Sequence, residues 1–151
     1  MCIDRVIPIN PLVLEPVDFS FAEGIEIPLF HCEISAGFPS PANDYLGEKI
    51  DLSTYLVQRP TTTYMLKVRG SSMVDADINE GDILVIDKSL KPIDGKPVIF
   101  FVDGEFTVKT FKRINGKAFL MPANPAYRPI ELTEEMNLQV WGVVIWVIHK
   151  P

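Results

Sequence analysis

Two dipeptides, Asp103-Gly104 and Asn115-Gly116, constrain the fold of this chain more than any other feature of its sequence. A two-residue hairpin of type I′ needs positive φ at both turn positions, which Asp, Asn and Gly accept most readily. Apolar and β-branched residues flank both dipeptides. The sequence therefore predicts three consecutive antiparallel strands, at 97–102, 105–113 and 117–121, in a chain built mainly from β-structure.

Three further apolar runs are bounded by turn-forming residues and are predicted as strands: 63–69, 82–87 and 138–148. The apolar run at 140–148 is too short to span a bilayer and suits a buried strand. One short helix is expected after Asp51, whose side chain can cap it, and this helix should end before Pro60.

Composition places the chain among globular proteins. Its 151 residues are 47% hydrophobic and 23% charged, which is enough for one ordinary core and favours one domain with an extension. The N-terminus lacks the basic segment of a secretory signal. The two cysteines, Cys2 and Cys32, show no metal-ligand spacing. We therefore expect a cytoplasmic protein without a metal or cofactor.

Residues 1–36 differ from the rest of the chain in charge and in pattern. They hold six acidic residues and one basic residue, so they carry −5 of the total net charge of −6. Four prolines interrupt any long helix, and only short extended pieces are expected, at 6–9 and 25–30. The segment is predicted to be a mobile, loosely held arm. Its acidity argues against direct binding of duplex DNA and favours a partner protein.

The candidate catalytic residues are a serine in a serine-rich turn and a lysine further along the chain. Gly70-Ser71-Ser72-Met73 follows the predicted strand 63–69, and by itself is typical of a turn. Lys109 lies in a predicted strand whose alternation puts Thr107 on the same face. A lysine on a strand usually faces solvent, but a buried lysine with a lowered pKa can act as the base for a serine nucleophile. Both interpretations stand at this point.

Three motifs occur in one order along the chain: 36–45 (AGFPSPANDY), 70–73 (GSSM) and 102–109 (VDGEFTVK). Together they resemble the LexA/UmuD family of self-cleaving Ser-Lys peptidases, and in particular its UmuD-like members. The resemblance runs from about residue 28 to the C-terminus. It implies a mainly β peptidase fold of curved antiparallel sheets. It also implies that an arm, residues 1–36, is removed from a Ser-Lys peptidase-like domain at 37–151.

The resemblance assigns roles to individual residues. The bond between Ala36 and Gly37 is the implied cleavage site, with Ser72 as nucleophile and Lys109 as general base. The backbone N–H groups of Ser71 and Ser72 are the candidate donors to the oxyanion. Both residues at the cleavage site are small, and the prolines that follow favour an extended, accessible segment, although an ordinary linker has the same features.

Two neighbouring residues compete for these roles. Ser71 could be the nucleophile, but the family pattern places the nucleophile directly before Met73. UmuD-like members carry an acidic residue at the position of Ser71, which is a departure at a variable position. Lys112 could be the base, but it lies on the opposite face of the strand from Lys109 and is expected to be solvated.

The function implied by the resemblance is mutagenesis in the SOS response to DNA damage. A RecA filament on single-stranded DNA would stimulate self-cleavage, and the cleaved form would act as a homodimer. That form would be the accessory subunit of an error-prone translesion polymerase with a UmuC-like Y-family subunit. The apolar strand at 140–148 would either contribute to the dimer contact or simply lie in the core.

Three alternatives remain for the function. A membrane signal peptidase also uses a Ser-Lys pair, but it needs a membrane anchor that this sequence lacks. A LexA-like repressor fragment is disfavoured because no DNA-binding domain is predicted before the cleavage site. A β-rich module that binds a polymerase complex without cleaving would have no need for an intact Ser-Lys pair beside an intact Ala-Gly site.

Overall fold

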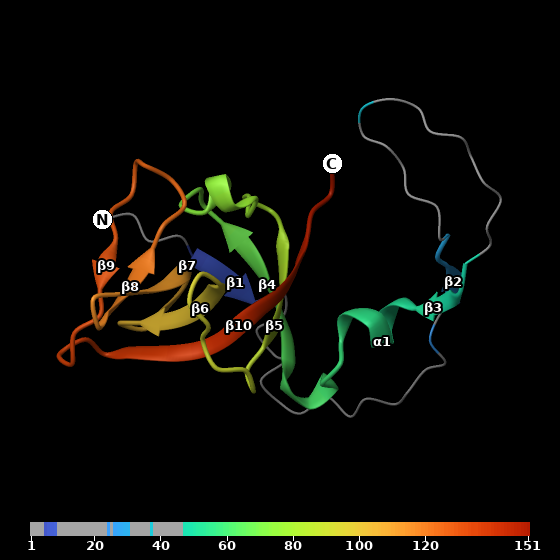
Figure 1. Cartoon of the computed structure of the whole chain (residues 1–151), viewed down its shortest axis with the longest axis horizontal. Coiled ribbons are helices and arrows are strands. Elements are labelled where there is room, and N and C mark those ends of the chain that lie inside the picture. Colours follow the sequence, from blue (N-terminus) through green and yellow to red (C-terminus); the bar gives the residue numbers. More distant parts are fainter. Residues whose placement is uncertain (1–4, 9–23, 25, 31–36, 38–46) are drawn as a thin grey trace. The chain divides into compact units, whose positions relative to one another are not determined.

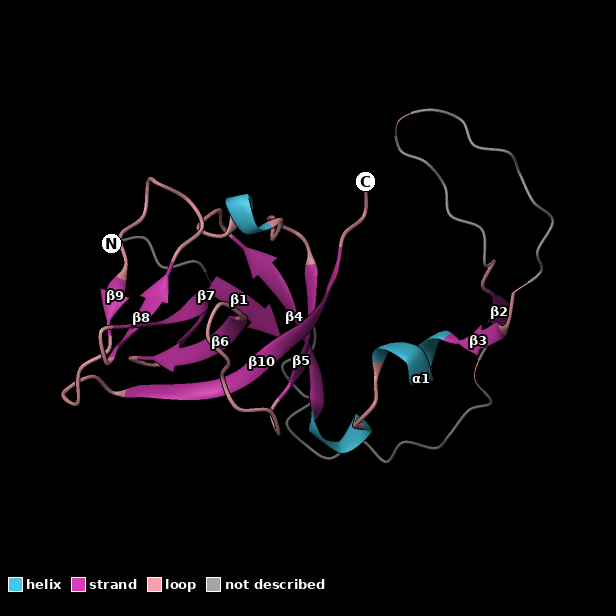
Figure 2. Cartoon of the chain, viewed as in Figure 1, coloured by secondary structure: helices cyan, strands magenta, loops and turns pink. Residues whose placement is uncertain are grey.

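A computed structural model of the chain describes residues 5–8, 24, 26–30, 37 and 47–151 (Figure 1). These residues form mainly β-structure, which confirms the predicted fold class (Figure 2). They fall into two units. One holds strand β1 (Arg5–Pro8) together with residues 59–151, and the other holds the described residues between 17 and 58.

These two units differ from the predicted division at Ala36-Gly37. That division is defined by the expected cleavage, and it stays a prediction. Most of the predicted arm, residues 1–36, lies outside the described residues. Its two expected extended pieces are represented by β1 and by β2 (Glu26–Pro28).

The larger unit is built on one eight-stranded antiparallel sheet with the order β1-β4-β5-β10-β6-β7-β8-β9. Its remaining strands are β4 (Thr63–Arg69), β5 (Ile83–Asp87), β6 (Pro97–Val102), β7 (Glu105–Ile114), β8 (Lys117–Met121), β9 (Ile130–Glu131) and β10 (Leu138–Ile148). Six of these match predicted strands to within one residue at each end. The short strand β9 was not predicted.

The two hairpin turns adopt the geometry that their residue types favour. All four turn residues have positive φ: 48° at Asp103, 86° at Gly104, 50° at Asn115 and 78° at Gly116. The registers close directly around them, with Val102 opposite Glu105 and Ile114 opposite Lys117. Strands β6, β7 and β8 are therefore the antiparallel meander predicted from the sequence.

Strand β10, the long red strand in Figure 1, joins the two halves of the sheet by pairing with both β5 and β6. Its register shifts between Val140 and Gly142, where the strand approaches β5 closely. A Cβ at Gly142 would overlap the Ile86 side chain and lie 3.3 Å from the Asp87 carbonyl oxygen. Glycine is therefore required for this close approach.

The prediction of a buried strand at 140–148 is correct only for the middle of β10. Val143 is buried, whereas Val140 and the last residues, Trp146 to Ile148, are exposed. Past Val143, β10 pairs with β5 only. This end of the strand therefore has no β6 neighbour to help cover it.

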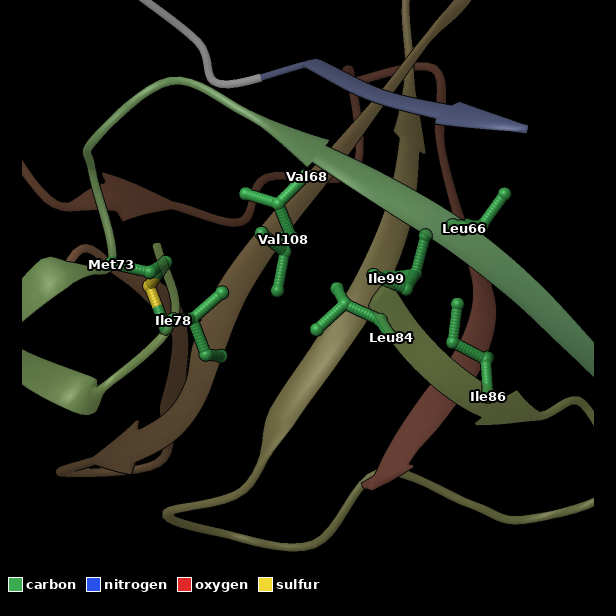
Figure 3. Close-up of a cluster of buried hydrophobic side chains, with 8 residues drawn as sticks. All are labelled: Leu66, Val68, Met73, Ile78, Leu84, Ile86, Ile99 and Val108. Carbon is green, nitrogen blue, oxygen red and sulfur yellow. The ribbon is translucent and has the colours of Figure 1, made fainter. Parts of the chain in front are cut away.

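The core of the larger unit consists of two clusters of buried apolar side chains. The first draws on β4, β5, β6, β7 and the segment after β4: Leu66, Val68, Met73, Ile78, Leu84, Ile86, Ile99 and Val108 (Figure 3). The second contains Val98, Phe100, Phe111, Leu120 and Val143. Successive residues of β6 alternate between the two clusters, so this strand is buried on both faces.

In the smaller unit, β2 pairs with β3 (Lys49–Asp51), and helix α1 (Leu52–Leu56) follows directly. The Asp51 side chain accepts a hydrogen bond from the Ser53 N–H at 2.9 Å, which confirms the predicted cap. Hydrogen bonds from Ser53 and Thr54 lower the pKa of Asp51. No helix within the described part of the chain is long and apolar enough to cross a membrane.

Candidate active site

The Gly70-Ser71-Ser72-Met73 segment forms the turn that ends β4. Gly70 has a φ of 102°, a left-handed conformation that glycine accepts most readily. Met73 is buried in the first apolar cluster and caps the 3₁₀ helix η2 (Val74–Ala76). Ser72 lies between these two anchors and is fully buried. The apolar methionine thus holds the serine below the surface.

Lys109 enters the same site from β7. Its side chain is only 2% exposed, and its backbone lies opposite Val98 of β6. The Lys109 Nζ lies 2.6 Å from the Ser72 Oγ, 3.1 Å from the Thr107 Oγ1 and 2.9 Å from the Val108 carbonyl oxygen. These three partners are uncharged oxygens. The two residues predicted as nucleophile and base are therefore in hydrogen-bond contact.

The two competing residues make different contacts. The Ser71 Oγ lies 3.1 Å from the Tyr127 hydroxyl. The Lys112 Nζ lies 3.8 Å from the Asp94 carboxylate, and the Lys112 side chain is 45% exposed. This exposure agrees with the prediction that Lys112 faces away from Lys109.

The predicted cleavage site is only partly described. Ala36 lies outside the described residues. Gly37 is exposed in the smaller unit, whereas Ser72 and Lys109 belong to the larger one. Within the described ranges, no group of three or more His, Cys, Asp and Glu side chains could hold a metal ion.

Two residues beside the Ser-Lys pair were not singled out from the sequence. Thr107 contacts the Lys109 Nζ, and the alternation of β7 already puts the two on one face. The Asn124 Nδ2 donates to the Ser71 carbonyl oxygen at 2.8 Å, and the neighbouring Ala123 N–H donates to the Ser72 carbonyl oxygen, also at 2.8 Å. No local pattern around Asn124 indicates this long-range contact.

Comparisons with known proteins give a family match and relatives that cover most of the chain. A family model described as Peptidase S24-like matches residues 28–145. The chain is 46% identical to Protein SamA of Salmonella typhimurium over 123 residues, covering 82% of this chain and 85% of SamA. It is 42% identical to Protein MucA of Escherichia coli over 120 residues, covering 78% and 81%. It is 38% identical to the LexA repressor of Bifidobacterium longum over 131 residues, covering 87% of this chain and 52% of the repressor.

Proposed function

The chain belongs to the Peptidase S24-like family, and we propose on that premise that it cuts its own backbone between Ala36 and Gly37. Ser72 is the proposed nucleophile and Lys109 the proposed general base. The observation that carries this proposal is the contact of 2.6 Å between two buried side chains, the Lys109 Nζ and the Ser72 Oγ. A serine and a lysine held together away from water are what a Ser-Lys peptidase requires.

The proposed base must be neutral, and two features support this state. Burial disfavours the charged ammonium form of a lysine. A neutral amine has two N–H donors and one lone pair. The Val108 carbonyl can only accept, and Thr107 can accept as well, so these two partners can take both donors. In that arrangement the lone pair can accept the hydroxyl proton of Ser72, whose Oγ lies 2.6 Å away.

The reaction proceeds through an acyl-enzyme. The Ser72 Oγ attacks the Ala36 carbonyl carbon while its proton moves to the Lys109 amine. The N–H groups of Ser71 and Ser72 are the proposed donors to the resulting oxyanion. The C–N bond then breaks, and the Lys109 ammonium returns the proton to the new amine of Gly37. Lys109 then deprotonates a water that attacks the Ser72 ester, the ester bond breaks as the Lys109 ammonium returns the proton to the Ser72 Oγ, and Ala36 leaves as a carboxylate.

The proposed biological role follows the UmuD-like resemblance. A RecA filament on single-stranded DNA stimulates the cleavage, and residues 37–151 then serve as a homodimeric accessory subunit of an error-prone translesion polymerase. A UmuC-like Y-family protein is the expected catalytic partner. The matches to SamA and MucA support this role over that of a repressor, because they span most of both chains, whereas the LexA match spans 52% of the repressor.

Four single variants test the assigned residues. Ser72→Ala and Lys109→Ala should abolish the fragment that begins at Gly37, because each removes one member of the reacting pair. Ser71→Ala keeps the backbone N–H and should retain cleavage, as should Lys112→Ala. The fragment is identified by mass spectrometry after incubation with RecA, ATP and single-stranded DNA. Loss of cleavage in the second pair with retention in the first would overturn the assignment.

A further inference from the structure

The segment that follows β8 holds the two carbonyl groups beside the proposed nucleophile. The Asn124 side chain donates to the Ser71 carbonyl oxygen, and the Ala123 N–H donates to the Ser72 carbonyl oxygen, both at 2.8 Å. The Ala123 carbonyl accepts from the Asp75 N–H at the same distance. Two hydrogen bonds therefore tie the turn that carries Ser72 to this segment, and a third ties the 3₁₀ helix η2 that follows the turn.

The bond from Asn124 helps to set the direction of the Ser71 carbonyl, which matters for the chemistry. The Val74 N–H also donates to this oxygen, at 3.4 Å, so the bond from Asn124 at 2.8 Å is the shorter of the two. The Ser71 carbonyl and the Ser72 N–H belong to one planar peptide unit, in which the two groups of a trans peptide point in opposite directions. Holding the Ser71 oxygen therefore aims the Ser72 N–H. That N–H is one of the two proposed oxyanion donors, and its contribution depends on how well it is aimed before the reaction.

The amide of Asn124 is itself oriented without ambiguity. Its Oδ1 accepts from the Ala126 N–H at 2.9 Å. A backbone N–H can only donate, so the side-chain atom facing it must be the oxygen, and the Nδ2 must face the Ser71 carbonyl. An aspartate at this position could keep the contact with Ala126 but could not donate to Ser71.

We propose that Asn124 is a positioning residue that aims the Ser72 N–H at the oxyanion formed during self-cleavage. This inference rests on the proposed function, since it assigns Asn124 a part in that reaction. Asn124 acts through the Ser71–Ser72 peptide unit and makes no contact with the reacting atoms in this scheme.

Two variants of the full chain remove the side-chain amide that donates to the Ser71 carbonyl, each in a different way. Asn124→Ala deletes the side chain without adding charge, whereas Asn124→Asp keeps its shape and its acceptor. Both should lower the self-cleavage rate by about tenfold to 10²-fold, because the Ser72 N–H stays in place but is less well aimed, and about 10²-fold is the cost of losing an oxyanion donor altogether. Tyr127→Phe is the matched control. It removes the hydroxyl that lies 3.1 Å from the Ser71 Oγ and leaves the main-chain contact in place, so its rate should stay within about twofold of wild type.

The pH profile separates this role from a general loosening of the site. In Asn124→Ala the plateau rate should fall while the midpoint of the profile stays where it is in the wild type, because the contacts of Lys109 are unchanged. A midpoint displaced toward that of a free lysine, about 10.4, would instead report an opened site and overturn the proposal. A plateau within about twofold of wild type, or an equal loss in Tyr127→Phe, would overturn it as well.

A second readout keeps this inference distinguishable from the proposed function. A fluorophosphonate reacts with an activated serine and develops negative charge on an oxygen in the same place. If the wild-type chain is labelled at Ser72 but does not cut itself with RecA, ATP and single-stranded DNA present, the proposed function fails. Slower labelling in Asn124→Ala than in Tyr127→Phe would then still uphold the role of Asn124. Equal labelling rates, or no labelling of wild-type Ser72, would contradict it.

Discussion

Lys109 owes its burial to contacts that the sequence alone does not reveal. Val108 packs in one apolar cluster, whereas Phe111, which shares a strand face with Lys109, packs in the other. Alternation along a strand predicts a solvated lysine only if one face of the strand is exposed to solvent. The side chains that shield this face from solvent come from strands remote in the sequence. The local pattern therefore could not decide between a buried base and a surface lysine.

The contact between Thr107 and Lys109 gives a prediction at the same scale. Thr107→Val keeps the shape of the side chain but removes the oxygen that lies 3.1 Å from the Lys109 Nζ. The first-order rate of self-cleavage should fall about fivefold to tenfold, because one net hydrogen bond of about 1 kcal/mol no longer holds the amine toward Ser72. Time courses of fragment formation measure this rate. Thr107→Ser should recover most of it, and an unchanged rate in Thr107→Val would exclude a positioning role.

The strands were largely predictable because their signals are local. The turns at Asp103-Gly104 and Asn115-Gly116 depend on residue types that accept positive φ, and the structure has positive φ at all four positions. The cap at Asp51 is equally local. By contrast, β9 and β3 are too short to carry a period, and each exists only through its pairing with a partner strand. The contact of Asn124 with Ser71 depends on tertiary structure in the same way.

Hydrogen bonds to a buried carboxylate, Asp87, connect the end of β5 to the 3₁₀ helix η1 (Pro60–Thr62). The carboxylate oxygens accept hydrogen bonds from Arg59 at 3.0 Å, from Thr62 at 2.9 Å and from the Ser89 hydroxyl at 2.7 Å. Burial by itself raises the pKa of Asp87, but the hydrogen bonds from Ser89, Thr62 and Arg59 outweigh it and lower the pKa from 3.8 to about 2.

A pH-dependent loss of stability follows for this connection. Because the folded-state pKa of Asp87 is depressed, its stabilising contribution is complete above the unfolded value of 3.8 and disappears as pH falls toward about 2. Near neutral pH, Asp87→Asn should lower the free energy of unfolding by about 2 kcal/mol. Urea denaturation at a series of pH values measures the difference from wild type. A difference that persists undiminished to about pH 2 would refute this account.

At the scale of the whole molecule, strand β1 lies on the N-terminal side of the proposed cut but belongs to the larger unit. Residues 5–8 pair with β4 in the register Arg5 opposite Arg69 and Pro8 opposite Leu66. Cleavage between Ala36 and Gly37 would therefore not by itself remove β1 from the sheet. Once β1 leaves, the backbone groups of β4 become an open sheet edge, which is a surface prone to pairing with another chain.

Hydrogen exchange tests whether β1 protects that edge. In the uncleavable Ser72→Ala background, Ile7→Pro removes an N–H from β1 and should disturb its pairing with Lys67. Amides of β4 should then exchange faster, by about tenfold or more, as measured by mass spectrometry of peptides covering residues 63–69. Val13→Pro, placed beyond the end of β1, is the control and should leave this exchange unchanged. Equal protection in Ile7→Pro and its parent would show that β1 does not protect β4.

The central claim is that a neutral Lys109 activates Ser72 to cut the chain after Ala36. The most direct measurement is mass spectrometry of the purified chain after hours at about pH 7 and at about pH 10, with Ser72→Ala alongside, because raising the pH toward the free-lysine value favours the neutral amine. The account predicts a fragment that begins at Gly37, forms faster at the higher pH and is absent from the variant. A fragment that forms at the same rate at both pH values, or that also forms in Ser72→Ala, would contradict it.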